Sequence, residues 1–204
     1  MVLIAGPNGS GKSTLTEALR SEAQFAGLEL FNPDEIGKDL RRSGAHAVMN
    51  WAGVRWPTDW AAARAVTKRV KDAISERHSF IVETVLSSPK YLSQATRAQE
   101  LGFYVAMVFV ALPTADLNVL RVQARVAQKG HGVSEKKIRA RWERSHEFLA
   151  KFAPLVDELR VFDNSRDSGP PRLVAWKAKR LDKIELLAPG VLPRVENALG
   201  LSPT

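Results

Sequence analysis

Residues 6–13 read Gly-Pro-Asn-Gly-Ser-Gly-Lys-Ser, which matches the pattern G-x-x-x-x-G-K-[ST] at every fixed position. This stretch lies between a short apolar run at residues 2–5 and a helical pattern that begins at Lys12. Glycines let consecutive backbone N–H groups point inward around a phosphate, and the following helix presents its positive N-terminal end to the same anion. The stretch therefore predicts a loop that binds the phosphates of a nucleotide.

The side chains of this loop have expected parts in that binding. Lys12 is expected to reach the β- and γ-phosphates and to take part in catalysis, and the Ser13 hydroxyl is expected to be a ligand of Mg²⁺. The loop thus predicts a nucleoside triphosphate and Mg²⁺ as cofactors, and it leaves open whether the nucleotide is ATP or GTP. The residues expected to contact the nucleotide around the loop are Asn8, Gly9, Ser10, Gly11, Lys12, Ser13 and Thr14.

Strand-like and helix-like segments alternate along the rest of the chain. Short apolar runs at residues 28–31, 80–82 and 104–111, and a run that ends at residue 162, are predicted strands, whereas residues 45–60 give no clear pattern. The alternation predicts an α/β fold, in which helices cover both faces of a parallel sheet and ligands bind at the carboxyl ends of its strands. We expect one domain over residues 1–204, with a hairpin and a closing helix at about residues 172–200.

The composition excludes several other kinds of protein. Of the 204 residues 45% are apolar and 25% are charged, which is ordinary for a globular protein and unlike a disordered chain. The absence of cysteine excludes disulfides, Fe–S clusters and a cysteine nucleophile, and it fits the reducing cytoplasm, where we expect the protein. The longest apolar run, residues 103–112, is too short for a membrane span of about 20 residues, and we expect no signal peptide.

Two acidic residues follow predicted strands on the expected ligand side of the sheet. Asp34 comes just after the second strand, where it could orient an acceptor hydroxyl and take its proton. It could instead simply favour the positive end of the helix that Asn32 caps. Glu83 ends the third strand, where it could support a metal ion or contact the substrate. The sequence leaves both pairs of alternatives open.

The net charge of +8 is concentrated in residues 121–151, which hold nine Lys and Arg against three Glu. This basic stretch follows the fourth predicted strand, where a lid that closes over phosphates would lie, and we predict such a lid at about residues 114–150. For any single residue of the stretch, a solvated basic face is the alternative. Two groups each share a face of one predicted helix: Arg121, Arg125 and Lys129, and Lys137, Arg141 and Arg144.

Five motifs occur in a definite order along the chain. They are Gly-Pro-Asn-Gly-Ser-Gly-Lys-Ser-Thr, Asn-Pro-Asp-Glu-Ile, Phe-Ile-Val-Glu-Thr-Val-Leu-Ser, the basic stretch from Arg121, and Phe-Asp-Asn-Ser. This series resembles the zeta-toxin family from residue 1 to about residue 165. The resemblance implies a P-loop NTPase fold, a three-layer α/β/α sandwich with a kinase-like five-stranded parallel sheet. It also implies transfer of the γ-phosphate of ATP to a small acceptor, and it places Asn164 where the chain passes the adenine.

The resemblance implies further partners and residue roles. In zeta toxins the acceptor is a UDP-activated N-acetyl amino sugar, and a small antitoxin protein neutralises the enzyme. Asp34 corresponds to the catalytic base, Glu83 and Thr84 fall in the segment that contacts the acceptor, and Arg125 and Arg141 fall among the lid arginines that bind phosphate. One departure concerns the sugar: zeta toxins follow the strand glutamate with Gly-Thr and an arginine that grips it, whereas here no arginine follows Thr84.

The main hypothesis is therefore an ATP-dependent kinase that acts on a small anionic molecule. The sequence leaves open whether it is the toxin of a toxin–antitoxin pair. A kinase of nucleic-acid ends is one alternative, motivated by the net charge. The chain lacks a long basic track interleaved with aromatic residues, so we expect no nucleic-acid partner, and no membrane partner either. A second alternative is a nucleotide-switched binding module, which would hydrolyse ATP slowly and release free phosphate.

Overall fold

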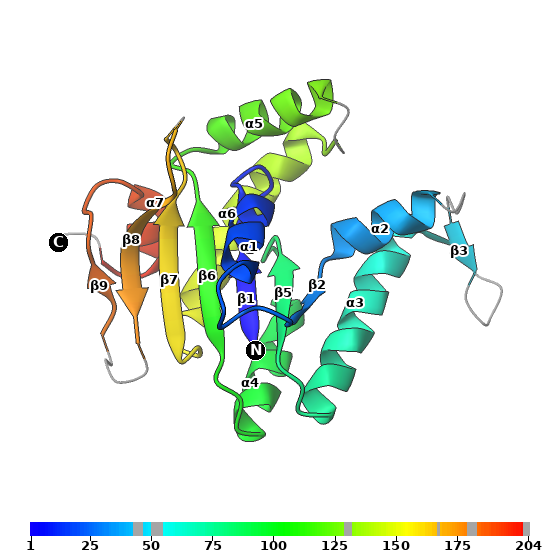
Figure 1. Cartoon of the computed structure of the whole chain (residues 1–204). Helices are drawn as coiled ribbons and strands as arrows, with labels where there is room; N and C mark the ends of the chain where they lie inside the picture. The colour runs from blue at the N-terminus through cyan, green and yellow to red at the C-terminus, as the bar shows by residue number, and fades with distance from the viewer. Residues whose placement is uncertain (43–46, 50–54, 129–131, 167, 179–182, 202–204) are drawn as a thin grey trace.

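A seven-stranded sheet forms the centre of the computed structural model, which describes residues 1–42, 47–49, 55–128, 132–166, 168–178 and 183–201. The strand order is β2-β5-β1-β6-β7-β8-β9, and the first five strands are parallel (Figure 1). The five-stranded parallel sheet that the resemblance implies is therefore confirmed. Its strands are β1 (Val2–Ala5), β2 (Glu29–Phe31), β5 (Phe80–Thr84), β6 (Ala106–Ala111) and β7 (Glu158–Asp163).

The C-terminal part of the chain widens this sheet. β8 (Arg172–Lys177) pairs antiparallel with β7, and β9 (Glu185–Leu186) pairs antiparallel with β8. The short helix α7 (Pro193–Ala198) follows, and its Val195 side chain is buried in the main core. The hairpin therefore continues the central sheet beyond β7.

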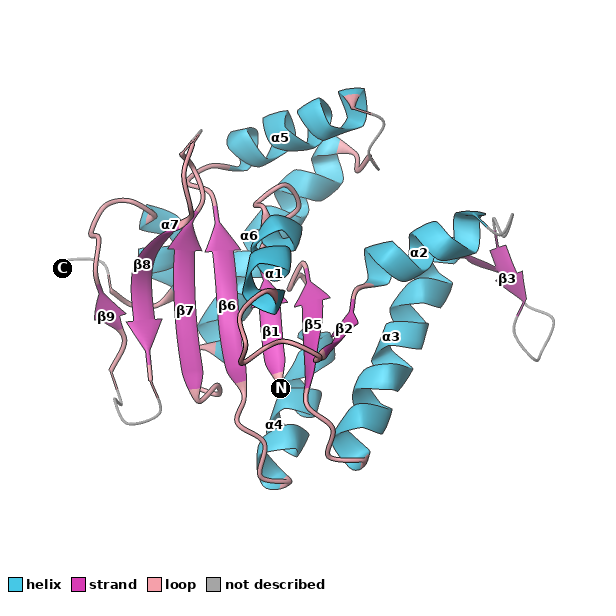
Figure 2. Cartoon of the chain, in the orientation of Figure 1, coloured by secondary structure: helices cyan, strands magenta, loops and turns pink. Residues whose placement is uncertain are grey.

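Helices cover both faces of the sheet, as Figure 2 shows. Because side chains alternate along a strand, Leu3 and Ala5 of β1 enter the larger core, whereas Ile4 enters a smaller core on the opposite face. The larger core is covered by α3 (Thr58–Ser75), α4 (Leu92–Glu100), α6 (Glu135–Phe152) and α7, and the smaller by α1 (Lys12–Arg20). This is the predicted three-layer α/β/α arrangement.

The carboxyl ends of the parallel strands meet at one edge, the upper edge in Figure 1. The helix α2 (Pro33–Arg42) begins directly after β2, and Asn32 caps it because its Oδ1 accepts a hydrogen bond from the Asp34 N–H at 2.8 Å. The helix α5 (Ala115–Ala127) follows β6, and its cap is the Thr114 hydroxyl, which accepts from the Leu117 N–H at 3.3 Å. A 3₁₀ turn, η1 (Pro89–Tyr91), follows β5.

The segment without a clear sequence pattern contains a separate antiparallel pair. It consists of β3 (Ala47–Met49) and β4 (Arg55–Pro57), and α3 begins directly after it. In Figure 1 this pair lies at the outer end of α2 and α3. Within the described residues, every helix is either too short or too polar to cross a membrane.

Candidate active site

The phosphate loop joins β1 to α1 at the carboxyl edge of the sheet. Its backbone turns back on itself, and the Ser10 N–H donates to the Pro7 carbonyl at 3.3 Å. Gly6 has φ +142°, and a Cβ there would lie 2.1 Å from the Val110 carbonyl oxygen of β6. Since that oxygen belongs to a central strand, a side chain at Gly6 could be accommodated only by moving the loop away from the sheet.

Lys12 is the buried cation at the centre of the site. Its Nζ donates to the Pro7 carbonyl at 2.8 Å, and burial lowers its pKa to about 8. The negative charges of Glu83 and Asp34 oppose this lowering of the pKa, whereas the positive charges of Arg125 and Arg141 add to it. The fold thus brings within electrostatic reach of Lys12 four side chains from β5, α2, α5 and α6.

Glu83, at the end of β5, is buried and binds three side chains. Its carboxylate accepts hydrogen bonds from Ser13 Oγ at 2.9 Å, Thr16 Oγ1 at 3.2 Å and Asn32 Nδ2 at 3.3 Å. Burial raises the pKa of Glu83, while the charge of Lys12 and the hydroxyl hydrogen bonds oppose the rise. These contacts place the carboxylate beside the Ser13 hydroxyl, so they favour support of a metal ion over contact with the acceptor.

The donors around Ser13 fit Mg²⁺. A hydroxyl oxygen and a carboxylate oxygen lie 2.9 Å apart, and hard oxygen ligands of this kind are those that Mg²⁺ uses when it is also bound to nucleotide phosphates. Asp34 is the second residue of α2, where it is exposed to solvent. An acceptor molecule could therefore reach the Asp34 carboxylate from outside.

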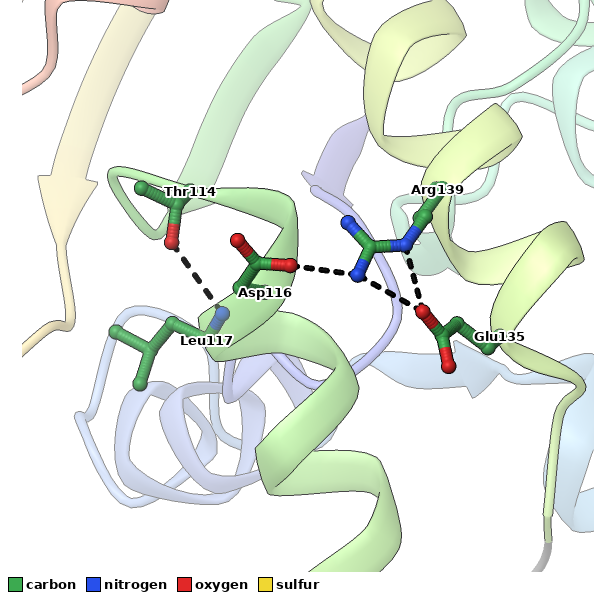
Figure 3. Close-up of polar contacts among 5 residues, drawn as sticks. All are labelled: Thr114, Asp116, Leu117, Glu135 and Arg139. Atoms are coloured by element: carbon green, nitrogen blue, oxygen red, sulfur yellow. Dashed lines mark hydrogen bonds and ion pairs between the residues drawn. The ribbon is translucent and has the colours of Figure 1, made fainter.

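The predicted lid consists of the helices α5 and α6, which differ in the parts of the protein that they contact. Arg139 of α6 forms ion pairs with Asp116 of α5 at 2.6 Å and with Glu135 at 2.8 Å, so the first turns of the two helices are joined (Figure 3). Arg141 Nη1 donates to Asn8 Oδ1 of the phosphate loop at 3.2 Å. The last turns of α6, by contrast, contribute Phe148 and other side chains to the main core. The first half of α6 therefore contacts the phosphate loop, and its last turns belong to the main core.

Two predicted site residues make contacts of another kind than expected. The resemblance places Asn164 near the adenine, and its side-chain Nδ2 donates to the Ser10 carbonyl of the phosphate loop at 2.8 Å. The resemblance places Thr84 in the segment that contacts the acceptor, and its Oγ1 accepts a hydrogen bond from the Leu86 N–H at 3.1 Å within the turn after β5. Thr14 lies on the exposed side of α1. A direct contact of these three residues with ligands stays a prediction.

Sequence reasoning missed three polar residues of the site. Thr16 and Asn32 both donate to Glu83, and Asn118 Nδ2 of α5 donates to the Asn8 carbonyl at 2.7 Å. One signal could have pointed to Asn118, because an asparagine in the interior of a helix, between Leu117 and Val119, has poor helix propensity and needs another reason to be there. Nothing local distinguishes Thr16, since it follows Lys12 by one ordinary helical turn.

Comparison with known proteins agrees with this architecture. A crystal structure of the AvrRxo1-ORF1:-ORF2 complex with ATP matches all of this chain and 64% of that one, at a TM-score of 0.65 and 14% identity. A structure from the PezAT chromosomal toxin–antitoxin system of Streptococcus pneumoniae matches 83% of this chain and 70% of that one, at a TM-score of 0.52 and 15% identity. At such low identities these likenesses concern the fold, which is that of P-loop kinases.

Sequence comparison identifies the family to which the chain belongs. An uncharacterized protein of Haemophilus influenzae is 28% identical over 141 residues, which cover 69% of this chain and 91% of that protein. The family model described as Zeta toxin matches residues 1–169, a range that includes the phosphate loop, both acidic residues, the predicted lid and Asn164. The chain is thus a phosphotransferase, and it belongs to the Zeta toxin family.

Proposed function

We propose that this protein is an ATP-dependent kinase that transfers the γ-phosphate of ATP to a hydroxyl group of a small anionic molecule. One observation carries the proposal. The buried ammonium of Lys12 lies within the electrostatic reach of two carboxylates, Asp34 and Glu83, and of two guanidinium groups, Arg125 and Arg141. Phosphoryl transfer needs such a mixed set, because cations stabilise the transferring group while a carboxylate receives the acceptor proton.

The cations would act on the phosphate side. Lys12 and the backbone amides of the loop would hold the β- and γ-phosphates, and Arg125 and Arg141 would stabilise the charge of the phosphoryl group from the lid. Ser13 and Glu83 would hold Mg²⁺, which when bound neutralises part of the charge on the phosphate oxygens. Arg139 is engaged by Asp116 and Glu135, so its part would be to join the lid helices.

Asp34 would act on the acceptor side. The acceptor oxygen forms a bond with the γ-phosphorus, the bond from that phosphorus to the bridging oxygen of ADP breaks, and the hydroxyl proton passes to the Asp34 carboxylate. Asp34 lies in the first turn of α2, where the partial positive charge of the helix N-terminus favours an acidic residue. A carboxylate at this position therefore suits both the helix and the transfer reaction.

Family membership extends this proposal to a particular acceptor and to a protein partner. Membership of the Zeta toxin family favours a UDP-N-acetyl amino sugar as acceptor and a small antitoxin protein as partner, and the PezAT neighbour belongs to a toxin–antitoxin system. No arginine follows Thr84, so the contact that zeta toxins make with the sugar through this arginine would differ here. The proposed acceptor class therefore depends more on the negative charge of the acceptor than on its sugar. The cytoplasm would supply both ATP and such an acceptor.

The test is label transfer in a metabolite mixture. The protein is incubated with γ-labelled ATP, Mg²⁺ and an extract of bacterial metabolites, and the labelled products are separated and identified. We expect the label on an anionic hydroxyl compound. Label found only as free phosphate would contradict the proposal and favour a nucleotide-switched module, and label on added oligonucleotide ends alone would favour a nucleic-acid kinase. Expression of the wild type beside Asp34→Ala tests toxicity, since equal growth of both strains contradicts a toxin role.

A further inference from the structure

Two asparagine side chains from distant parts of the chain form hydrogen bonds with the phosphate loop. Asn118 of α5 donates its Nδ2 to the Asn8 carbonyl at 2.7 Å, and Asn164, directly after β7, donates its Nδ2 to the Ser10 carbonyl at 2.8 Å. Asn118 is fully buried, although it lies on a helix of the lid. The two contacts therefore hold alternate carbonyl groups of one short loop.

These contacts also orient the backbone N–H groups of the loop. In a trans peptide the C=O and N–H groups point in opposite directions, so fixing the Asn8 carbonyl turns the Gly9 N–H to the other side, and fixing the Ser10 carbonyl does the same for Gly11. Among the described residues, neither the Gly9 nor the Gly11 N–H donates to a protein acceptor. Both glycines are only partly buried, and backbone donors left in this state are suited to a bound anion.

The two glycines are packed directly against the asparagines. A Cβ on Gly9 would lie 2.7 Å from the Asn118 carbonyl oxygen, and a Cβ on Gly11 would lie 2.1 Å from Asn164 Nδ2. Both glycines also have positive φ, +80° and +96°, which side chains disfavour. The asparagine residues and the glycines are therefore in close contact, and a side chain at either glycine would require the neighbouring asparagine to move.

We propose that Asn118 and Asn164 are positioning residues that keep the Gly9 and Gly11 amides aimed at the phosphate site before any nucleotide binds. An anion site that is already formed does not lose affinity to the ordering of its own loop. The two asparagine hydrogen bonds also link the loop to α5 and to the end of β7, so the lid helix rests on the loop through a buried side chain. The inference rests on the proposed binding of ATP phosphates by this loop.

Binding of inorganic tripolyphosphate tests this inference without any transfer reaction. Asn118→Leu and Asn164→Leu remove the amide donors at similar volume, and Gln123→Leu removes an amide from the exposed side of α5 as the control. We expect each asparagine variant to bind tripolyphosphate and ATP about three- to tenfold more weakly, the effect of about one hydrogen bond. The double variant should lose about the product of the two factors, and Gln123→Leu should bind as the wild type does.

An amide spectrum separates positioning from mere stability. In the ligand-free wild type, Gly9 and Gly11 should each give one sharp amide resonance. Asn118→Leu should shift or broaden that of Gly9, and Asn164→Leu that of Gly11, while Gly102, far along the chain, stays unchanged. Folded variants that keep both resonances and the wild-type affinity would overturn the inference. An equal loss of tripolyphosphate affinity in Gln123→Leu would overturn it as well. If Asn118→Leu does not fold, Asn164→Leu decides the matter, because Asn164 is only partly buried.

Because tripolyphosphate carries neither a base nor an acceptor, the outcomes separate the two proposals. Tight binding by the wild type, weakened in the asparagine variants, supports the positioning role even if no acceptor is ever phosphorylated. Wild type that binds ATP but not tripolyphosphate would contradict the positioning role and leave kinase activity standing. Wild type that binds neither would overturn both.

Discussion

The Ser13 hydroxyl donates a hydrogen bond to Glu83 Oε1 across 2.9 Å and so joins the first turn of α1 to the end of β5. Asn32, which caps α2, donates to the other oxygen of the same carboxylate. A single buried carboxylate thus connects the phosphate side of the site, through Ser13, with the element that carries Asp34. Its charge state should influence both sides.

Glu83→Gln should raise the Mg²⁺ concentration needed for phosphoryl transfer by about tenfold or more, because an amide oxygen binds a hard cation less well than a carboxylate. Titration of the rate with Mg²⁺ at fixed ATP measures this. Glu17→Gln, on the exposed side of α1, is the matched control and should leave the titration unchanged. A Glu83→Gln titration that overlays that of the wild type would remove Glu83 from the metal site.

The same carboxylate predicts a pH dependence. Burial raises the pKa of Glu83 above that of an ordinary glutamate, and only its ionised form would support the metal. The rate should therefore fall with decreasing pH, and the fall should begin at a higher pH than an unperturbed glutamate would give. The remaining activity of Glu83→Gln should not show this fall of the rate at low pH. If the fall is unchanged in Glu83→Gln, it belongs to the titration of another group.

Lys12→Met should abolish transfer and at the same time stabilise the ligand-free protein. The pKa of Lys12 is about 8 in the folded state and 10.5 when unperturbed, so its charged form is disfavoured by folding. This cost is complete below pH 8 and disappears as the pH rises to 10.5. At pH 7 the variant should gain up to about 3 kcal/mol in unfolding free energy.

Denaturant unfolding without nucleotide, at pH 7 and pH 10, measures this gain. The difference between Lys12→Met and the wild type should shrink at the higher pH. Lys38→Met, on the exposed side of α2, should show little difference at either pH. A variant that is less stable than the wild type at both values would mean that the Lys12 hydrogen bond to Pro7 outweighs the desolvation of its charge.

The contact between α5 and α6 should depend on apolar packing more than on charge. Ile138 is buried with Val119 and Val122 between α5 and α6, and Ile138→Ala should lower the unfolding free energy by about 2–5 kcal/mol. Arg139→Ala removes the exposed ion pairs of Figure 3 and should change it little. Thermal unfolding of both variants checks the order, and a larger loss for Arg139→Ala would reverse this interpretation.

Local sequence features predicted the parallel strands and the phosphate loop well, because each depends on residues that are neighbours in the sequence. The apolar run at residues 2–5 and the glycines after it need no distant partner to be recognised. The cap of α2 is likewise local, since Asn32 bonds the Asp34 N–H two residues later. The antiparallel pair of β3 and β4 escaped prediction because its strands are only three residues long, too short for an alternating pattern.

The side-chain contacts of the site could not be predicted in this way. Asn118 and Asn164 bind loop residues that lie 110 and 154 positions away, and Thr16 binds Glu83 across 67 positions. Such contacts depend on which strands become neighbours in the sheet, and no local pattern records that order. Asn164 shows the consequence, because its position beside the site was anticipated and its contact with the Ser10 carbonyl was not.

The central claim is that Asp34 receives the acceptor proton during phosphoryl transfer. The most direct measurement is the rate of label transfer from γ-labelled ATP at saturating ATP, for Asp34→Ala beside Asp39→Ala, which removes an exposed carboxylate from the same helix. Asp34→Ala should lose about 100- to 10,000-fold in rate and keep its affinity for ATP, while Asp39→Ala transfers label as the wild type does. Equal rates for the two variants would contradict the claim.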